Sequence, residues 1–423
     1  MTDLPASLAG MLQHIERRAP PSGIDLGLDR VRQVLARLSL QFGATRIISI
    51  AGTNGKGSTV AFLEAIAGRA GITTLAFTSP HLVAFGERFR FNGVPGDDDR
   101  IADALCAVER ARGDVALTWF EHVTLAALVL ASRASPDWLI LEVGMGGRLD
   151  AVNAVDADVA VITSIGLDHQ RFLGRTRAAI AREKCGIARA GKPMIVAEKR
   201  PPAGMLDALR DQRAEIFLAG HDFDWRWRAG RVTLDLGRRV LRGIVPGLSG
   251  RHQAGNAAAA ARAALVLAPA LDDRTLSDGI AGARLAGRFE RVARAPDVIV
   301  DVAHNPAAAR VLAAQLERMP GAKVAVFAAL ADKDVEGIVR PLAGAFEHWY
   351  AATLDVPRGL RAAELIERMR ALPADRCVEA LESVPDALDA ALAACRPEQT
   401  VVVFGSFITA AAALQALERR RQE

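Results

Sequence analysis

The chain has 423 residues, of which 51% are hydrophobic and 24% are charged, and its formal net charge is only +4. No apolar run is long enough to cross a bilayer, and the first residues lack the apolar core of a signal peptide. The basic residues are scattered rather than gathered into arms, so a pI near 9.1 does not by itself indicate a nucleic-acid-binding protein. We therefore expect a cytoplasmic protein that binds neither membranes nor nucleic acid.

The length exceeds what one hydrophobic core usually supports, so two domains are expected. The four cysteines, Cys106, Cys185, Cys377 and Cys395, have neither the spacing of a zinc site nor the density of a disulfide framework. We expect them to be reduced thiols.

The first distinctive stretch lies at residues 24–31, which lead into a predicted helix through Leu35, Leu38 and Leu40. A short apolar run at 47–51 then has the length of a buried strand, and apolar residues from Ser58 onward recur at helical spacing. The tight turn between this strand and this helix is the centre of the sequence.

That turn carries Gly52, Gly55 and Gly57, with Lys56 and Ser58 beside them. Glycines bring successive N–H groups close to an anion, the helix start adds its positive dipole end, and a lysine supplies a point charge. The alternative is a glycine-rich turn without a ligand, but the lysine and serine favour phosphate. Because the spacing departs from G-x-x-x-x-G-K-[ST], the hydroxyl that usually holds Mg²⁺ is displaced and is expected to come from elsewhere.

Lysine is rare in this chain, which contains only six among its 53 basic residues. A lysine inside a motif therefore indicates a need for an amine. Lys56 and Lys184 stand out for this reason.

Three strands are predicted to end in side chains that can hold a metal. The strand at 74–78 ends before Ser79, because Pro80 cannot donate to a sheet; the strand at 138–143 contains Glu142; and the strand at 159–165 precedes His169. Ligands of open parallel sheets bind at the carboxyl ends of strands, and hard oxygen and nitrogen donors suit Mg²⁺. A buried glutamate also needs a partner or a metal, although an isolated loop serine would be unremarkable.

Between these strands, residues 117–122 contain two aromatic residues before an alanine-rich helix at 123–132. These aromatics fit core packing as well as they fit stacking on a ligand. The glycine-rich run at 144–150 offers a second anion-ready loop, and a helix from Thr176 ends in residues 182–187.

Residues 216–245 are arginine-rich and strand-like, with Trp225 and Trp227 alternating, and predict a small sheet on the flank of the domain. A helix is expected within 248–267. We place the domain boundary at 287/288, in a stretch that carries Arg284, Arg288 and Arg291.

The second domain shows strands at 298–302, 324–328, 349–352 and 401–404, alternating with helices that begin near Pro306, Asp334, Arg361, Val384 and Ile408. The predicted fold is therefore α/β: an N-terminal P-loop-type ATPase domain with a mostly parallel sheet, and a smaller C-terminal Rossmann-like α/β domain. Asp301, at the end of the first of these strands, could accept a hydrogen bond from a ribose hydroxyl.

These motifs together resemble the folylpolyglutamate synthase/dihydrofolate synthase family, a branch of the Mur-type ATP-dependent amide ligases. The most specific segments are 51–58, 141–153 and 182–187, supported by 78–82, 164–169, 301–306, 331–334 and 404–407. The resemblance covers nearly the whole chain, with an ATP-binding Mur-ligase-like domain at 1–287 and a glutamate-ligase domain at 288–423.

The resemblance implies the site residues. ATP would be held by Thr53, Asn54, Gly55, Lys56, Gly57, Ser58, Asn256, Arg288 and Asp301. Ser79, Glu142 and His169 match the magnesium ligands of the family, which implies two Mg²⁺ ions. Lys184 matches a lysine that the family carries as a carbamate, and such chemistry requires a free amine that an arginine could not supply. The active site would then lie between the domains.

The acceptor segments of bifunctional bacterial members are matched by Asp25, Leu26, Gly27, Leu28, Thr118, Trp119, Phe120, Glu121, Leu149, Asp150 and Ala151. In those members the segments bind the pterin of dihydropteroate. The match favours a stacking role for Phe120 and predicts both synthase activities.

The implied reaction takes the γ-phosphoryl of ATP onto a carboxylate and then attaches L-glutamate, with dihydropteroate and tetrahydrofolate as acceptors. Lys56, Lys184 and His304 are the expected catalytic residues, and His304 would orient or deprotonate the glutamate amine, although it could merely cap a helix. Two departures from the family pattern, Ala307 and Cys185, remove no metal or phosphate group. We expect a monomer.

Alternative readings are a folylpolyglutamate synthase alone, another Mur-type amino-acid ligase, or a phosphate-loop kinase or regulator. The last would leave Lys184 and the strand end at 301–304 without a use.

Overall fold

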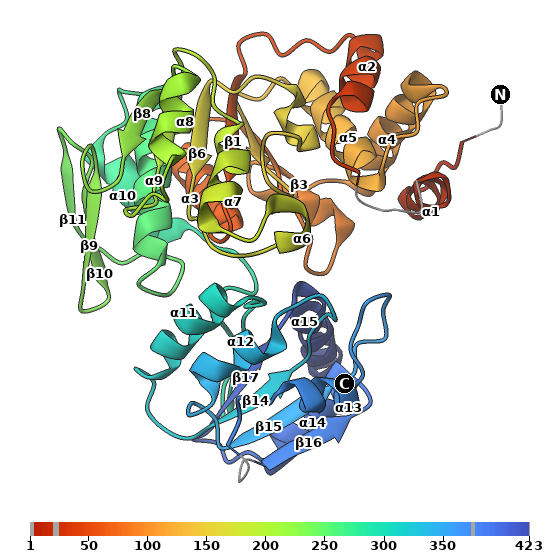
Figure 1. Ribbon diagram of the computed structural model, residues 1–423, viewed down its shortest axis with the longest axis vertical. Helices are drawn as coiled ribbons and strands as arrows, with labels where there is room; N and C mark the ends of the chain where they lie inside the picture. Colours follow the sequence, from red (N-terminus) through yellow and green to blue (C-terminus); the bar gives the residue numbers. More distant parts are fainter. Residues whose placement is uncertain (1–3, 20–24, 374–376, 423) are drawn as a thin grey trace. The chain divides into compact units, whose positions relative to one another are not determined.

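The computed structural model describes residues 4–19, 25–373 and 377–422, which form two compact units (Figure 1). The first is made of the described residues up to His81, Phe85–Gly247 and Gln253–Arg284. The second contains Leu82–Ala84, Leu248–His252 and the described chain from Leu285 onward. None of the described helices is long and apolar enough to cross a membrane.

An eight-stranded sheet forms the centre of the first unit, in the order β4-β3-β2-β5-β1-β6-β7-β8. Its strands are β1 (Arg46–Ala51), β2 (Thr74–Phe77), β3 (Phe89–Phe91), β4 (Val94–Pro95), β5 (Trp138–Glu142), β6 (Val159–Ile162), β7 (Pro193–Val196) and β8 (Glu215–Leu218). The pairs from β2 to β8 are parallel, and only β3 and β4 at one edge are antiparallel. The predicted mostly parallel sheet is thus confirmed, although the edge hairpin was not foreseen.

The helices of the first unit lie on both faces of this sheet. They are α1 (Leu8–Arg18), α2 (Asp29–Leu38), α3 (Lys56–Arg69), α4 (Asp98–Arg112), α5 (Trp119–Ala134), α6 (Gln170–Leu173), α7 (Arg177–Cys185), α8 (Met205–Asp211), α9 (Gln253–Leu267) and α10 (Asp273–Gly282), with short 3₁₀ turns η1 (Phe85–Arg88) and η2 (Ala151–Ala154).

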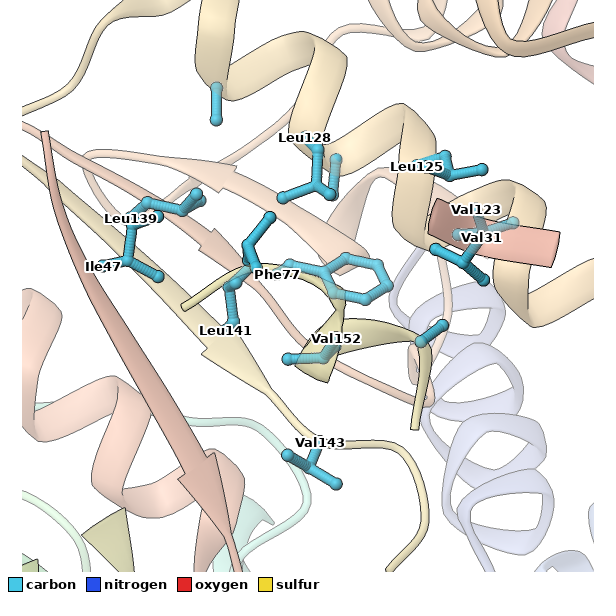
Figure 2. Close-up of a cluster of buried hydrophobic side chains, with 14 of the residues drawn as sticks. Val31, Ile47, Phe77, Val123, Leu125, Leu128, Leu139, Leu141, Val143 and Val152 are labelled. Carbon is cyan, nitrogen blue, oxygen red and sulfur yellow. The ribbon is translucent and has the colours of Figure 1, made fainter. Parts of the chain in front are cut away.

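The period of two along the strands explains this two-sided arrangement. Ile47 of β1 and Leu139 of β5 belong to the same buried cluster as Leu128 of α5, and Figure 2 shows these side chains around Phe77. The next residue of β1, Ile48, is also fully buried, but it points to the opposite face, where α3 and α9 pack on the strands. Both faces are apolar because both are covered.

A small sheet of β9 (Asp224–Arg228), β10 (Arg231–Asp235) and β11 (Val240–Ile244) accompanies the first unit, as predicted. The first residues of the predicted 216–245 sheet do not belong to this small sheet. They form part of β8, which pairs with β7 and extends the main sheet.

The second unit has a six-stranded sheet in the order β12-β13-β17-β14-β15-β16. The strands are β12 (Glu290–Ala293), β13 (Asp297–Val300), β14 (Lys323–Phe327), β15 (His348–Ala352), β16 (Cys377–Leu381) and β17 (Thr400–Phe404). The helices are α11 (Pro306–Leu316), α12 (Val335–Val339), α13 (Ala362–Arg368), α14 (Val384–Ala394) and α15 (Phe407–Gln422), with the 3₁₀ turn η3 (Arg340–Leu342). All strand pairs are parallel except β12 with β13. This mostly parallel sheet confirms the predicted second α/β unit, although strands β12 and β16 were not predicted.

Candidate active site

The turn after β1 presents an uncapped helix start. Gly55 is the N-cap of α3 and has a φ of 89°, a conformation that favours glycine. Because glycine has no side chain, it gives the first turn of α3 no side-chain acceptor. The free N–H groups and the positive end of the helix dipole therefore suit an anion.

The turn is held in shape by the segment that follows β6. The Thr163 and Ser164 hydroxyls donate to the Asn54 carbonyl at 2.7 and 2.9 Å, and the Thr53 N–H donates to the Ser164 carbonyl at 2.8 Å. A Cβ at Gly52 would lie 1.8 Å from Thr163 Oγ1, so the two segments touch directly. Thr53 and Asn54 thus fix the loop through protein contacts.

Helix α9 supports the same turn from the other side. The Gln253 amide donates to Ser58 Oγ at 3.3 Å, and the Asn256 amide donates to Gln253 Oε1 at 2.8 Å. Asn256 also occupies the space beside Gly55: a Cβ added to Gly55 would lie 2.4 Å from Asn256 Oδ1. Gln253 was missed from the sequence, although it lies one helical turn before Asn256 and faces the same side.

Two lysines share one acceptor in this site. Lys56 Nζ donates to the Gly52 carbonyl at 3.2 Å, and Lys184 Nζ, from the end of α7, donates to the same oxygen at 3.0 Å. Burial and the nearby charge of Lys56 together lower the pKa of Lys184 to about 7, although Asp168 and Asp150 oppose the shift. A substantial fraction of Lys184 is therefore a neutral amine near neutral pH.

Of the three predicted metal ligands, Ser79 and Glu142 lie at strand ends of the first unit, whereas His169 lies well beyond the end of β6, at the start of α6. The Ser79 N–H donates to Glu142 Oε2 at 3.4 Å, and Glu142 Oε1 lies 4.0 Å from Lys56 Nζ, so Ser79, Glu142 and the phosphate loop converge. His169 is the N-cap residue of α6, has a φ of 49° and keeps 40% of its side chain exposed.

The chemistry of these residues fits a magnesium ion. A hydroxyl and a carboxylate are hard oxygen donors of the kind that Mg²⁺ prefers, an imidazole can complete the set, and Glu142 is only 5% exposed. In the described part of the chain, no three His, Cys, Asp or Glu side chains form a metal-sized group. The predicted ligands, Ser79, Glu142 and His169, would not form such a group, because only two of them are of these residue types.

Arg30, which was not foreseen, joins two of the three predicted acceptor segments. Its guanidinium donates to Asp25 Oδ2 at 2.6 Å and to Glu121 Oε1 at 2.9 Å. Glu121 also forms a capping box with Thr118 at the start of α5. The structure thus brings Asp25 and residues 118–121 together; Leu26, Gly27 and Leu28 connect this corner to α2.

The aromatic pair at the start of α5 is half-buried. The ring of Phe120 lies 6.0 Å from that of Phe77, and its edge approaches Gly144 so closely that a Cβ there would be 2.5 Å away. Trp119 lies 4.8 Å from the Arg88 guanidinium. Phe120 therefore contacts the core and the glycine-rich loop together.

The loop after β5 is fixed by Asp150. Its carboxylate accepts from the N–H groups of Met145 at 2.8 Å and Val152 at 3.0 Å and caps the 3₁₀ turn η2, which begins at Ala151. Burial raises the pKa of Asp150 to about 6, although these hydrogen bonds oppose the shift. Its neighbour Leu149 is half-buried.

In the second unit, Asp301 accepts from the N–H groups of Phe289 and Ala303, each at 2.8 Å. Burial raises its pKa, and the charge of Arg288 opposes the shift. Arg288 lies 5.1 Å from the ring of Phe407, and His304 Nδ1 lies 2.9 Å from the Val302 carbonyl.

Two family models match the chain: the Mur ligase middle domain over residues 50–264 and the Mur ligase glutamate ligase domain over residues 287–407. Together with the phosphate loop and the two α/β units, these matches place the protein in the Mur ligase class of ATP-dependent ligases. A dihydrofolate synthase/folylpolyglutamate synthase of Escherichia coli (strain K12) is 40% identical over 423 residues, covering 98% of this chain and 96% of the relative. The chain belongs to the dihydrofolate synthase/folylpolyglutamate synthase family, as the motifs predicted.

Two solved structures extend the comparison. E. coli FolC in complex with DHPP and ADP superimposes with a TM-score of 0.94 at 39% identity, with 100% of both chains covered. A bifunctional folylpolyglutamate synthase/dihydrofolate synthase with Mn, AMPPNP and L-glutamate bound gives a TM-score of 0.90 at 37% identity, covering 98% of this chain and 100% of the other.

Proposed function

We propose that this ligase adds L-glutamate to dihydropteroate, giving dihydrofolate, and to tetrahydrofolate, giving polyglutamates. The observation that carries the proposal is the pair of lysines on the Gly52 carbonyl beside an uncapped helix start, in a chain that belongs to a family of bifunctional synthases. Relatives that bind ADP, DHPP and L-glutamate support the nucleotide, the acceptor and the amino acid.

ATP would be held mainly by residues 53–58. The N–H groups at the start of α3 would donate to phosphate oxygens, and Lys56 would add its charge at the β- and γ-phosphates. Asn256, which supports Gly55, would contact the nucleotide from α9, and Arg288 and Asp301 would contribute from the second unit.

Two Mg²⁺ ions would be held by Ser79, Glu142 and His169, and the Mn in a relative's structure supports a divalent metal. Bound there, they would supply positive charge next to the phosphates. Lys184 would carry the carbamate: its neutral amine attacks CO₂, a C–N bond forms, and one proton leaves. The lowered pKa of Lys184 supports this step, because a protonated amine cannot attack.

The reaction would proceed in two balanced steps. An oxygen of the acceptor carboxylate attacks the γ-phosphorus, the bond to the bridging oxygen breaks, and ADP leaves with an acyl phosphate formed. The glutamate amine then attacks the acyl carbon, phosphate leaves, and the amine loses its proton. Lys56 offsets the negative charge as the two anions meet, and positioning supplies much of the remainder. His304 would orient or deprotonate the amine.

The pterin would lie against residues 25–28, 118–121 and 149–151, with Phe120 stacking on it. Arg30 links Asp25 to Glu121, and η2, which begins at Ala151, contacts α5, which supports a single acceptor pocket. We also propose a cytoplasmic monomer, with an ATP-binding domain at 1–287 and a glutamate-ligase domain at 288–423.

The test is phosphate release with MgATP and L-glutamate, comparing dihydropteroate with tetrahydrofolate and identifying products by mass. Glutamylated product from both acceptors is expected. Product from tetrahydrofolate alone would contradict the proposed dihydrofolate synthase activity and the proposed stacking role of Phe120. Phosphate release without any amide product would contradict the proposed substrates.

A further inference from the structure

Arg88 is a buried cation that neither the motifs nor the proposed mechanism uses. It ends η1, directly before β3, and is only 6% exposed. Its carbonyl accepts from the Thr78 N–H at 2.9 Å, and its Nε donates to His81 Nδ1 at 2.8 Å. The residue is thus anchored on both sides of Ser79.

The guanidinium is held by aromatic faces rather than by a carboxylate. It lies 4.8 Å from the Trp119 ring and 5.6 Å from the Phe85 ring. None of the described residues accepts a hydrogen bond from its two terminal nitrogens, and none of them forms an ion pair with it. Burial lowers the pKa of Arg88 to about 10, with Glu142 and Glu87 opposing the shift, and the group stays charged near neutral pH.

Arg90, two residues further along, is a half-buried arginine whose guanidinium has protein partners. Its Nε donates to both oxygens of Glu64, at 3.2 and 3.1 Å, and its NH1 donates to Thr78 Oγ1 at 3.1 Å. Arg90 therefore has a structural partner, whereas Arg88 presents a planar edge with two donors that the described chain does not use. A buried charge of this kind needs a compensating anion.

The position of Arg88 indicates which anion. One side of the guanidinium contacts Trp119, which belongs to a predicted acceptor segment. Glu142, one of the proposed metal ligands, is close enough to raise the pKa of Arg88. The acceptor carboxylate must lie between the pterin and the γ-phosphate. A guanidinium edge binds a carboxylate through two parallel hydrogen bonds, which a lysine cannot match.

We propose that Arg88 binds the reacting carboxylate of the acceptor: the benzoate carboxylate of dihydropteroate or the terminal carboxylate of a folate glutamate chain. This inference rests on the proposed function. Arg88 keeps its proton throughout. It holds both carboxylate oxygens on binding, and one hydrogen bond is released as that oxygen attacks phosphorus while the other remains, so the repulsion between the two anionic substrates is reduced.

The test compares binding of pteroate with that of its carboxamide, pteroamide, by equilibrium dialysis, without ATP turnover. In Arg88→Met, pteroate affinity should fall about 100-fold, and pteroamide affinity should change by less than about 3-fold. Arg88→Lys should fall between wild type and Arg88→Met. Equal losses for both ligands would overturn the proposal, because they would mean that Arg88 only shapes the pocket.

Two further variants separate the remaining explanations. Arg262→Met removes another half-buried guanidinium, 4.2 Å from the Phe217 ring, and should leave the affinity for both ligands unchanged. His81→Leu removes the partner of Nε. If this variant loses affinity for pteroate and for pteroamide to the same extent, the arginine acts by positioning the Ser79 loop, and the proposal fails. Wild-type enzyme that binds pteroate through Arg88 but forms no amide would refute the proposed function and leave this assignment intact.

Discussion

The first unit contains two groups of charged side chains that differ in how their charges are paired. Around Glu109 of α4, one carboxylate accepts from Arg112 at 2.6 Å, from Arg18 at 2.7 Å and from His14 at 3.1 Å. At the phosphate loop, two cations, Lys56 and Lys184, donate to a single neutral carbonyl. In the first group the cations contact their carboxylate directly. In the second group the two lysines contact a carbonyl oxygen, and the Glu142 carboxylate lies 4.0 Å from Lys56 Nζ.

The difference separates a structural cluster from a binding site. The Glu109 cluster ties α1 to α4, and its charges are compensated within the protein. At the lysine pair, the charge of Lys56 helps to lower the pKa of Lys184, and a bound anion would offset the repulsion between the two amines. Buried cations that contact no carboxylate directly therefore indicate a ligand site, and the same reasoning applies to Arg88.

The largest effect is expected for Lys184→Arg. An arginine stays protonated and cannot form a carbamate, so turnover should fall about 1000-fold or more. In ¹³C-bicarbonate, NMR should show a carbamate signal in the wild type and none in the variant. Because the amine is deprotonated above a pKa of about 7, the wild-type signal should rise as the pH increases from 6 to 8.

The matched control is Lys192→Arg, at a half-exposed lysine that pairs with Asp158 at 3.0 Å. It should retain both the signal and the turnover. Wild-type turnover in Lys184→Arg would exclude the carbamate.

Glu109→Gln tests the compensated cluster. The change leaves Arg112 buried without its charge partner, and the free energy of unfolding should fall by about 3 kcal/mol, measured by urea denaturation. Values of kcat/KM should stay unchanged, because no substrate contact is assigned to Glu109.

The pH dependence of stability gives a second readout at this site. Burial raises the pKa of Glu109, but hydrogen bonds from Arg112 and His14 outweigh it, so the net pKa is lowered from 4.5. A lowered carboxylate pKa stabilises the fold above the unfolded value and loses that contribution as the pH falls below about 4.5. Glu109→Gln should therefore flatten the acid limb of the stability curve.

Asp103→Asn is the control, since Asp103 pairs with Arg133 at 2.8 Å with both side chains largely exposed. It should change stability by less than about 0.5 kcal/mol. An equal loss in both variants would mean that burial does not distinguish the two pairs.

The smallest of these effects is expected for Gly55→Ala. The new Cβ would lie 2.4 Å from Asn256 Oδ1, and the alanine would have to adopt the positive φ that Gly55 has, which a residue with a Cβ disfavours. Nucleotide affinity, measured by calorimetry with ADP, should therefore fall about 30-fold. Gly71→Ala is matched, because Gly71 also has a positive φ of 69° but nothing within 4 Å of its Cβ position. If both variants bind ADP equally, the contact with Asn256 has no role in shaping the loop.

Local patterns predicted most of the elements but not the edges of the sheets. The fully buried strands β1, β5 and β17 were found from apolar runs, since a strand covered on both faces is apolar along its length. Strands β4 and β16 were missed because they lie at sheet edges and are largely exposed, which weakens the apolar signal.

The sequence by itself determined the phosphate loop, the residues at the strand ends, the α/β class and the family, because glycine spacing, strand-end residues and apolar runs are local features. Only the tertiary structure decided which of these groups meet. Lys184 reaches the Gly52 carbonyl across 132 positions, and Arg30 reaches Glu121 across 91. The orientation of the Arg88 guanidinium depends on Trp119 and His81 together, and no local sequence pattern predicts such a contact. Charge compensation is a property of packed neighbours, so the distinction between a structural charge and a binding charge appears only in the folded chain.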